Sequence, residues 1–521
     1  MTTPSTPPVR PVPLRHWLAV VGSMLGAFMA VLDIQITNAS LKDILGTLGA
    51  TMEEGSWVST SYLVAEIVVI PLTAWLADVF SARRYLILST IGFLLSSVAC
   101  AWAWDLQSLI LFRVVQGFTG GAMIPMALAL VLRLLPPARH ALGFALFGMT
   151  ATLAPAVGPS IGGWLTDNYG WPWIFYLNLI PGAIMLLAIG IGLDRQPSKP
   201  AMLREGDWPG ILTMAVGLGC LITLLEEGHR HDWMDSIAMR WLALVATIGL
   251  TASVIIEWRG SRPFLDLRLL ARKDFAVGCG ISMAFGLGMY GVMFALPVYL
   301  AQVQGYNAGQ IGRTIMWSGI PQLVMMPVAA LLTLRIDSRK LVAAGLGLFA
   351  VSCFMNGRVT ALTAHDQLRA SQIIRALGMP LVIVPLTGLA TRGLPVAESG
   401  SASALFNMLR NLGGSIGIAM VATRVDARAH WHARQLGESI SAYDATVWDH
   451  LRAATTGMGR HGADPVTAAK QGLAITARMV QQEASVRAFG DAFTMLGLAL
   501  LLAIPLVLLL PRHTGKTAPS H

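Results

Sequence analysis

The stretch that decides the fold covers residues 17–38 and reads WLAVVGSMLGAFMAVLDIQITN. It holds a single ionisable residue, Asp33, and it is long enough to cross a hydrocarbon core of roughly 30 Å as an α-helix. Because a backbone in lipid must satisfy its own hydrogen bonds, the stretch is predicted to be a transmembrane helix. Its length and the lack of a small-residue cleavage site argue against a removable signal peptide. Asp33 is therefore a carboxylate inside the membrane.

Similar apolar stretches recur along the whole chain. Of its 521 residues, 55% are hydrophobic and only 12% are charged, a composition that excludes a soluble domain of this size. The apolar runs predict an all-α integral membrane protein with fourteen transmembrane helices, at residues 17–38, 56–77, 85–103, 107–132, 141–166, 173–193, 208–225, 237–256, 276–300, 311–334, 341–357, 370–391, 401–423 and 488–510.

A weak internal repeat indicates how these helices are organised. AWLADVFSARR at 74–84 resembles ALLTLRIDSRK at 330–340, and Arg113 and Arg375 occupy matching places in the fourth and twelfth spans. Duplicated halves are the usual build of secondary transporters, which bind substrate between the halves near the midplane. We therefore predict a cytoplasmic tail (1–16), a six-helix bundle (17–193), two inserted helices (208–256), a second six-helix bundle (276–510) with a periplasmic loop (425–486), and a cytoplasmic tail (511–521).

The distribution of Lys and Arg predicts the orientation. Arg15, Arg84, Arg133 and Arg339 are among the many basic residues that fall in the short loops on one side, and few fall on the other. The positive-inside rule then makes both termini cytoplasmic in a multi-pass protein of the bacterial inner membrane. The net charge of +9 follows from this topology, so a nucleic-acid partner is not needed to explain it.

Three charged residues lie inside the first bundle. At 1.5 Å per residue, Asp33, Arg113 and Glu66 fall at depths of roughly 8, 10 and 15 Å, so they can meet in one cavity. Such residues are costly in a membrane and mark functional sites by default, and a carboxylate whose surroundings alternate can load and release a proton. Two alternatives stay open: Asp33 and Arg113 form a permanent structural ion pair, and Glu66 either stays protonated or selects cationic substrates.

Other ionisable residues are given no role. Arg375 and Arg410 also lie within spans, and we expect them to bond to backbone carbonyls or water because no acid lies at a matching depth in the ninth or tenth span. Four acids fall at helix ends, where reaching water costs little, and they are Glu226, Glu227, Glu257 and Asp491.

The chemistry of an enzyme is not visible. The four cysteines stand at unrelated spacings inside apolar spans, and the eleven histidines show no paired metal spacing. We therefore predict no metal, no cofactor and no catalytic residues. A sensor or receptor without transport is the remaining non-transport interpretation, although no soluble signalling domain accompanies it.

Several motifs together resemble the major facilitator superfamily, in particular the fourteen-helix drug:proton antiporters of the EmrB/QacA type. They are LDIQITN at 32–38, RVVQG at 113–117, GPSIGG at 158–163, WPWIFYLN at 171–178 and NMLRNLGG at 407–414. The resemblance covers nearly the whole chain. It implies the major facilitator fold and alternating access by two rocking halves.

The resemblance also implies roles for particular residues. Asp33 and Arg113 become the proton-coupling pair, with Glu66 as a further candidate. The substrate cavity is expected to hold Asp33, Glu66, Tyr290, Met293 and Asn407. Tyr290 and Met293 are included for their aromatic and methionine side chains rather than for the resemblance, and lipid-facing filler stays open as the alternative for both. The gating motifs are represented by Asp78, Arg83, Gly158, Pro159 and Gly162. The loop around Asp78 departs from the family pattern, because Ala74 and Ser81 replace glycines and Val79 replaces a basic residue.

The predicted function is proton-coupled export of drugs or other small amphipathic compounds across the inner membrane. The long loop at 425–486 is similar to that of EmrB-type pumps, which implies a periplasmic adaptor (a membrane fusion protein) and an outer-membrane channel as partners, besides substrates, protons and membrane lipid. A dedicated exporter of a metabolite, fatty acid or siderophore would share all these features, and the sequence leaves it open.

Overall fold

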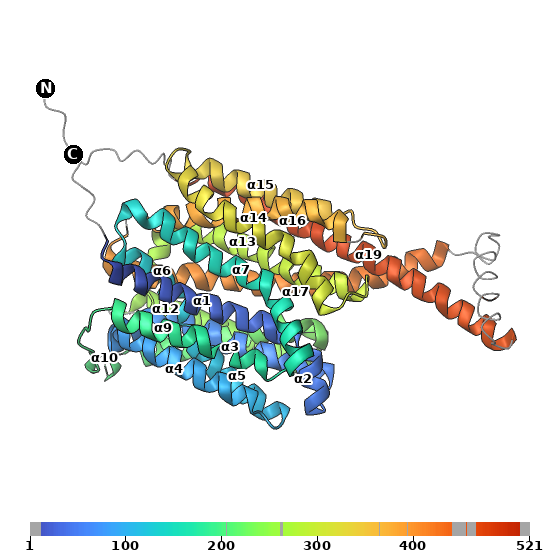
Figure 1. Ribbon diagram of the computed structural model, residues 1–521, viewed down its shortest axis with the longest axis horizontal. Helices are drawn as coiled ribbons and strands as arrows, with labels where there is room; N and C mark the ends of the chain where they lie inside the picture. Colours follow the sequence, from blue (N-terminus) through green and yellow to red (C-terminus); the bar gives the residue numbers. More distant parts are fainter. Residues whose placement is uncertain are drawn as a thin grey trace.

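The computed structural model describes residues 12–204, 206–260, 264–363, 365–392, 394–439, 455 and 465–510. Residues 1–11 and 511–521 of the predicted tails, and most of the centre of the predicted periplasmic loop, lie outside them. Helices packed side by side make up the described part (Figure 1).

The first bundle is built from helices between residues 14 and 192. Their bounds are α1 (Leu14–Ala39), α2 (Leu41–Leu48), α3 (Met52–Phe80), α4 (Ala82–Ala101), α5 (Leu106–Gly120), α6 (Met123–Leu134), α7 (Pro137–Tyr169), α8 (Trp173–Tyr176) and α9 (Leu179–Gly192). The predicted fourth span is thus divided into α5 and α6, and the sixth into α8 and α9. The break after α5 lies where Gly121 approaches α3, since a Cβ there would come within 2.9 Å of the Glu66 backbone.

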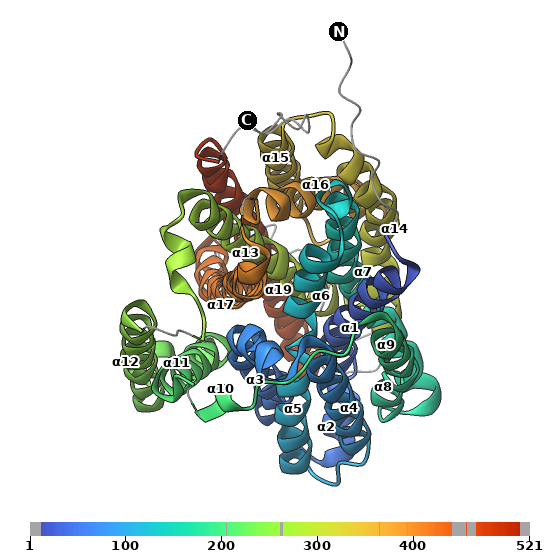
Figure 2. The same cartoon turned by 90° about the vertical axis from the view of Figure 1, so that its left-hand side faces the viewer.

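The second bundle follows a short connector and two further helices. Its helices are α13 (Lys273–Gln302), α14 (Ala308–Thr333), α15 (Ser338–Asn356), α16 (His365–Ala390), α17 (Ser399–Ser439) and α19 (Pro465–Val507). Between the bundles come α10 (Ala201–Arg204), α11 (Trp208–Glu227) and α12 (Ile237–Arg259). Figure 2 shows α11 and α12 at one side of the molecule, with α11 the nearer to α3.

Within the described residues, thirteen helices are long and apolar enough to cross a membrane. α17 is as long but more polar, and it packs against α13 and α19 as the fourteenth. α17 and α19 continue well beyond the predicted spans at 401–423 and 488–510, and they extend together past the end of the bundle (Figure 1). Parts of the segment predicted as a loop are therefore helical.

Side-chain caps explain where two of the helices begin. The Thr51 hydroxyl accepts a hydrogen bond from the Glu54 backbone N–H (3.3 Å), and the Glu54 carboxylate accepts one from the Thr51 N–H (3.0 Å) at the start of α3. Asn307 and Gln310 make the same reciprocal pair at the start of α14. These capping boxes satisfy backbone donors that a helix leaves free at its first turn.

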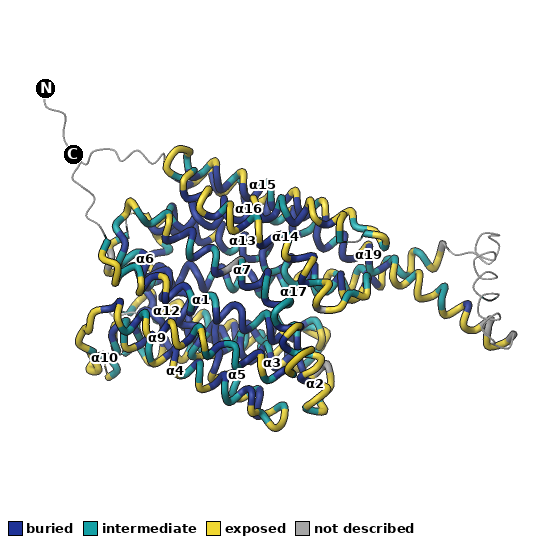
Figure 3. The backbone as a smooth tube through the Cα atoms, viewed as in Figure 1, coloured by how far each residue is buried: buried dark blue, intermediate teal, exposed yellow. Residues whose placement is uncertain are grey.

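Burial distinguishes the interior of the bundle from a lipid-facing exterior. Buried residues line the contacts between helices, and exposed ones gather on outer faces and helix ends (Figure 3). On α12, Ile237, Trp241 and Ile248 are each at least 60% exposed. An outer surface with this many large apolar side chains is stable in contact with the hydrocarbon core of a membrane and not in water.

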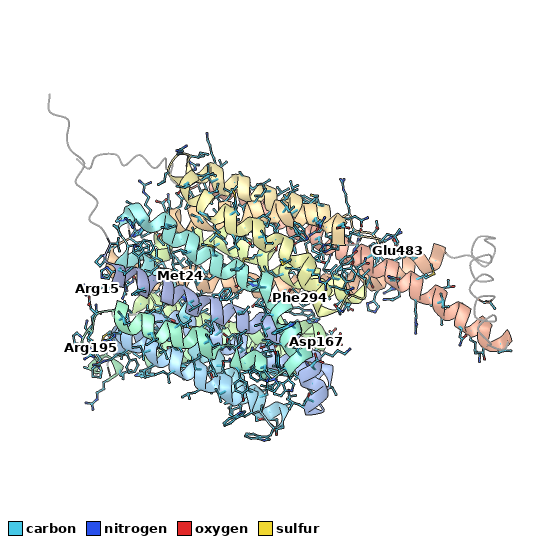
Figure 4. The ribbon with its side chains drawn as sticks, viewed as in Figure 1. Arg15, Met24, Asp167, Arg195, Phe294 and Glu483 are labelled. Atoms are coloured by element: carbon cyan, nitrogen blue, oxygen red, sulfur yellow. The ribbon has the colours of Figure 1, made fainter. Side chains whose placement is uncertain are left out.

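Basic residues gather at one end of the bundle, which we call the basic end. Arg15 at the start of α1 and Arg195 after α9 lie there, whereas Asp167 lies towards the opposite end (Figure 4). α1 begins and α19 finishes at this same end (Figure 1). That arrangement agrees with an even number of crossings.

Close backbone contact holds α13 against α17. A Cβ atom at Gly413 would overlap the carbonyl oxygen of Met283, and one at Gly417 would overlap that of Leu287. Glycines four residues apart allow such an approach. The van der Waals contact that results stabilises helix association in lipid, where the hydrophobic effect does not drive helices together.

This packing predicts different outcomes for two Gly→Ala substitutions. Gly413→Ala should destabilise the protein by about 1–3 kcal/mol, because the added methyl group forces the two backbones apart. Gly347→Ala on α15 is the matched control, since nothing lies within 4 Å of its added Cβ. Thermal unfolding of the purified variants in detergent measures both. Equal melting temperatures for Gly413→Ala and the wild type would contradict the packing described.

Candidate functional site

Asp33 is buried inside the first bundle and pairs with Arg113. The residues are 2% and 0% exposed, and Arg113 Nη1 donates a hydrogen bond to Asp33 Oδ2. α1 and α5 bring the two side chains together from residues 80 apart in the sequence. The structure therefore brings together the two residues that the sequence places at similar depth, at a place where neither charge reaches water.

Amides complete the surroundings of the Asp33 carboxylate. Its Oδ1 accepts hydrogen bonds from Asn178 Nδ2 (2.7 Å) and Gln116 Nε2 (3.0 Å). Both amides also donate to Ser97 Oγ, at 3.0 Å from Asn178 and 2.7 Å from Gln116. Each carboxylate oxygen thus accepts at least one hydrogen bond, which stabilises the ionised form of Asp33.

Arg113 connects this network to α3. Its Nε donates to the backbone carbonyl of Val58 (3.1 Å), and its guanidinium lies 4.3 Å from the centre of the Tyr62 ring. The Nη2 atom is buried without a hydrogen-bond partner among the described residues. Arg113 therefore has spare donor capacity, which a rearrangement of α3 can use.

Three residues of this network were given no role from the sequence. Gln116 and Asn178 stand within quoted motifs, and Ser97 does not. Gln116 follows Arg113 by three residues, which places both on one helical face, and this spacing was the signal available. Asn178 lies in the break between α8 and α9, which the sequence did not indicate.

Glu66 faces charges from both bundles. It lies on α3 and is 4% exposed, and its carboxylate is attracted by Arg113 and Arg410 and repelled by Asp33. Arg410 belongs to α17 and donates from Nη2 to Asn407 Oδ1 (2.7 Å). The charge on Glu66 is thus influenced both by the Asp33 network of the first bundle and by Arg410 of the second bundle.

Tyr290 and Asn407 gather around the same arginine. The hydroxyl of Tyr290 on α13 is 3.4 Å from Oδ1 of Asn411, the residue that follows Arg410. Arg410 was expected to bond to backbone carbonyls or water. It donates instead to the side chain of Asn407, one turn earlier on α17.

A narrow cavity lies between the two bundles. Its lining residues are Gln35, Pro155, Ala156, Pro159, Val292, Met293, Leu296, Pro297, Ile315, Ser318, Gln322, Arg375 and Met379. Of the predicted cavity and motif residues, Met293 and Pro159 line it, whereas Asp33, Glu66, Tyr290 and Asn407 do not. Its volume of about 20 Å³ has room for roughly one water molecule, so a drug-sized ligand does not fit in this conformation.

The glycine motif of α7 forms one wall of this region. A Cβ atom at Gly158 would lie 2.6 Å from Gln35 Cβ, and one at Gly162 would lie 3.0 Å from the Ile36 carbonyl oxygen. These glycines let α7 lie directly against α1. Pro155 and Pro159 remove hydrogen bonds from the same part of α7, which also packs against α14 of the other bundle.

Asp78 and Arg83, the gating residues predicted in the loop between the second and third spans, lie at the basic end. Asp78 is 4.0 Å from Arg133 Nη2, and Arg133 Nε donates to Ser399 Oγ (3.1 Å) at the start of α17. Arg83 Nη2 donates to the Gly190 carbonyl oxygen (2.6 Å) within the first bundle. Asp78 is thereby connected to the second bundle through Arg133, and Arg83 is not.

Two acids expected to reach water are buried. Glu227 is 1% and Glu257 is 0% exposed. The carboxylate of Glu227 accepts hydrogen bonds from Ser56 (3.0 Å) and Thr60 (2.7 Å) of α3. The expectation for Glu227 was wrong because α11 packs against α3, so the end of α11 faces protein instead of the membrane surface. Glu257 lies near the end of α12 and accepts a hydrogen bond from the Leu265 backbone N–H (3.3 Å), so the chain that follows α12 covers it.

The other two acids that were expected at helix ends are Glu226 and Asp491, and their surroundings differ. Glu226 Oε1 is buried without a hydrogen-bond partner in the described residues. Asp491 lies inside α19 rather than at a helix end, and it accepts hydrogen bonds from Arg428 (2.5 Å) and His432 (3.0 Å).

Comparison with known proteins gives the family. The model of the Major Facilitator Superfamily matches residues 23–418, more than two thirds of the chain. The chain belongs to the Major Facilitator Superfamily. It is accordingly a multi-pass membrane transporter and not an enzyme.

Several curated relatives are similar over most of their length. "Colistin resistance protein EmrB" of Acinetobacter baumannii is 32% identical over 95% of this chain and 96% of its own. "Multidrug export protein EmrB" of Escherichia coli K12 is 33% identical over 82% and 83%. "Fatty acid resistance protein FarB" of Neisseria gonorrhoeae is 31% identical over 94% and 96%. The predicted resemblance to EmrB-type proteins is therefore confirmed.

Solved structures support the fold. The human organic anion transporter MFSD10 (TETRAN) matches 96% of this chain and all of its own, with a TM-score of 0.62 at 15% identity. The proton:xylose symporter XylE matches 97% of this chain and 98% of its own, with a TM-score of 0.56 at 13% identity. At these identities the likeness concerns the major facilitator fold alone, which confirms the predicted fold class.

The buried ion pair predicts strong coupling between two substitutions. Arg113→Met should destabilise the protein by about 3–5 kcal/mol, because it leaves the Asp33 carboxylate buried without its cation. Adding Asp33→Asn should recover part of that loss, because no buried charge is then unpaired. Thermal unfolding of the two single variants and the double variant gives the coupling free energy. Strictly additive losses would show that the two side chains do not depend on each other.

Proposed function

We propose that the protein exports drugs or other small amphipathic compounds across the bacterial inner membrane in exchange for protons. The observation that carries this proposal is the buried Asp33–Arg113 network, together with Glu66 next to it. Ionisable groups at such depth are expensive, and in transporters they form proton and substrate pathways. The names of the relatives, which include multidrug export, support the class of cargo.

Asp33 is the proposed proton site, and Glu66 relays its state to the other bundle. With Asp33 ionised, Arg113 is held by the carboxylate, as in the conformation described here. Protonation weakens that pair and frees Arg113 to interact more strongly with Glu66, which Arg410 also attracts. The balance of charge between α3 and α17 then changes, and the contact between the bundles changes with it.

In the proposed cycle, the structure described here is a closed intermediate. The cavity is too small for cargo, and Arg133 connects the bundles at the basic end through Ser399. We assign the basic end, and with it both termini, to the cytoplasm on the positive-inside rule. Breaking the contact between Arg133 and Ser399 opens the cavity to the cytoplasm.

One narrower possibility remains part of the proposal. A dedicated exporter of a metabolite, fatty acid or siderophore would use the same coupling site, and one relative is named for fatty acid resistance. A panel of toxic compounds and fatty acids separates the two cargo classes.

Proton release from everted membrane vesicles tests the proposed function. We expect an exported compound to release protons from wild-type vesicles, and Asp33→Asn to reduce that release at least about tenfold at matched protein levels. If Glu66 carries protons, Glu66→Gln should reduce the release for every compound. If it selects cations, only cationic compounds should be affected.

Asp366→Asn is the control for this assay, because its side chain is 80% exposed at the start of α16. Undiminished proton release by Asp33→Asn would contradict the coupling role. A fall in the amount of folded protein, with normal release per molecule, would show that the Asp33–Arg113 pair is structural only.

We further propose that the extension of α17 and α19 contacts a periplasmic adaptor, which connects the exporter to an outer-membrane channel. Both helices continue past the bundle (Figure 1). Exposed apolar side chains lie along α19, among them Leu473 (61% exposed) and Met479 (60%). Apolar side chains on an extramembrane helix favour contact with another protein.

Charged substitutions on this extension separate adaptor contact from transport itself. Leu473→Asp with Met479→Asp should lower the tolerance of whole cells to an exported compound several-fold, because the adaptor contact is lost. The same variant should release protons normally in everted vesicles, where transport needs no adaptor. Gln471→Asp, exposed in the same part of α19, is the control. Unchanged cell tolerance of the double variant would contradict the adaptor contact.

A further inference from the structure

We propose that Arg375 binds an anionic group of the exported compound in the cavity between the bundles, so that the preferred cargo is an anionic amphiphile. The inference rests on the proposed export function and specifies its cargo. Arg375 lies on α16, ten residues after the helix begins, which places it roughly 15 Å along the helix. It is 4% exposed and lines the cavity.

The guanidinium of Arg375 lacks a counter-ion in the described part of the chain. No acidic side chain there forms an ion pair with it, its Nε is buried without a hydrogen-bond partner, and its electrostatic neighbour is the thiol of Cys353. The other two buried arginines have side-chain partners, since Arg113 pairs with Asp33 and Arg410 Nη2 donates to Asn407 Oδ1 (2.7 Å). Burying a cation without an anion is costly, so an anion that enters this cavity supplies the counter-ion that Arg375 lacks.

Further polar groups converge on the same space. Gln322 Nε2 is buried without a hydrogen-bond partner in the described residues, and Gln322 lines the cavity with Gln35 and Ser318. The hydroxyl of Ser318 donates to the Ile315 carbonyl oxygen (2.8 Å). A guanidinium beside an amide N–H suits a carboxylate, sulfonate or phosphate oxygen, which accepts from both.

The remaining walls are apolar. Pro155, Met293, Ile315 and Met379 belong to four different helices of both bundles. Methionine side chains adapt to ligands of different shape, which suits a varied apolar body. The cavity must widen before such a ligand enters, and separation of α7 from α14 during the transport cycle provides that movement.

Three aromatic probes with one ring system test the proposal. They are 1-naphthoate (anionic), 1-naphthamide (neutral) and 1-naphthylmethylammonium (cationic), and their binding to the purified full chain in detergent is measured by calorimetry at neutral pH. Wild-type protein should bind naphthoate at least about tenfold more tightly than naphthamide, as expected for a charge-assisted hydrogen bond. Equal affinities, or no binding of naphthoate, would overturn the proposal.

Variants of two arginines on one helix locate the site. Arg375→Gln should remove the preference for naphthoate. Arg375→Lys should retain part of it, because the positive charge remains while the planar guanidinium, which can donate two hydrogen bonds to one carboxylate, is lost. Arg369→Gln is the matched control, since Arg369 lies six residues earlier on α16 and pairs with Asp366 at 3.4 Å. An unchanged preference in Arg375→Gln would contradict the assignment. Arg375→Lys also keeps the test decisive if Arg375→Gln fails to fold.

Vesicle assays separate this inference from the export function. If Arg375→Gln loses proton release with naphthoate but keeps it with a neutral or cationic exported compound, the anion site is supported. If the wild type releases protons with neutral and cationic compounds only, the anion site is wrong and the export function stands. If the wild type releases protons with no compound of any charge, the export function fails as well.

Discussion

A buried charge must find a partner, and this constraint shapes the centre of the molecule. Asp33 on α1 meets it with Arg113 and the Gln116 amide of α5, and with the Asn178 amide from the break between α8 and α9. Those helices cannot move independently without leaving a charge or an amide unsatisfied in low dielectric. The network thus makes the first bundle a unit, which a rocking mechanism requires.

Contact between the bundles is of a different kind. α7 packs along α14, and α17 packs along α3 and α6. Among the described residues the polar contacts across this boundary are few, and they include the hydrogen bond from Ser403 Oγ to the Pro125 carbonyl oxygen (2.6 Å). Arg133 with Ser399 holds the basic end, and the electrostatic interaction of Glu66 with Arg410 spans the centre. A boundary held by few polar contacts separates at lower cost than the interior of either bundle, so motion is expected there.

The inserted helices add a contact at the opposite end from Arg133. Glu227 at the end of α11 accepts hydrogen bonds from Ser56 and Thr60 of α3, and Trp233 after it donates to Thr423 of α17 (3.1 Å). α11 and the turn that follows it therefore contact both bundles. This arrangement gives α11 and the turn after it a structural part in the fold beyond filling space in the membrane.

Much of this could be predicted from the sequence, and the failures have identifiable causes. Apolar length predicted the helices, and the single acid of the first span with the single base of the fourth predicted the Asp33–Arg113 pair, because depth in a membrane follows from position in a helix. The partner of Arg410 and the burial of Glu227 were missed. The burial of Glu227 depends on which helices are neighbours across the bundle, and depth alone does not contain that information.

The central claim is that binding of the exported compound and binding of a proton are coupled through one buried carboxylate, Asp33. The most direct test measures the protons released when an exported compound binds to the purified protein in weakly buffered solution, using a pH indicator. The account predicts that binding changes the number of bound protons in the wild type and leaves it unchanged in Asp33→Asn at equal occupancy. The same proton change in both proteins would show that Asp33 is not the coupling site.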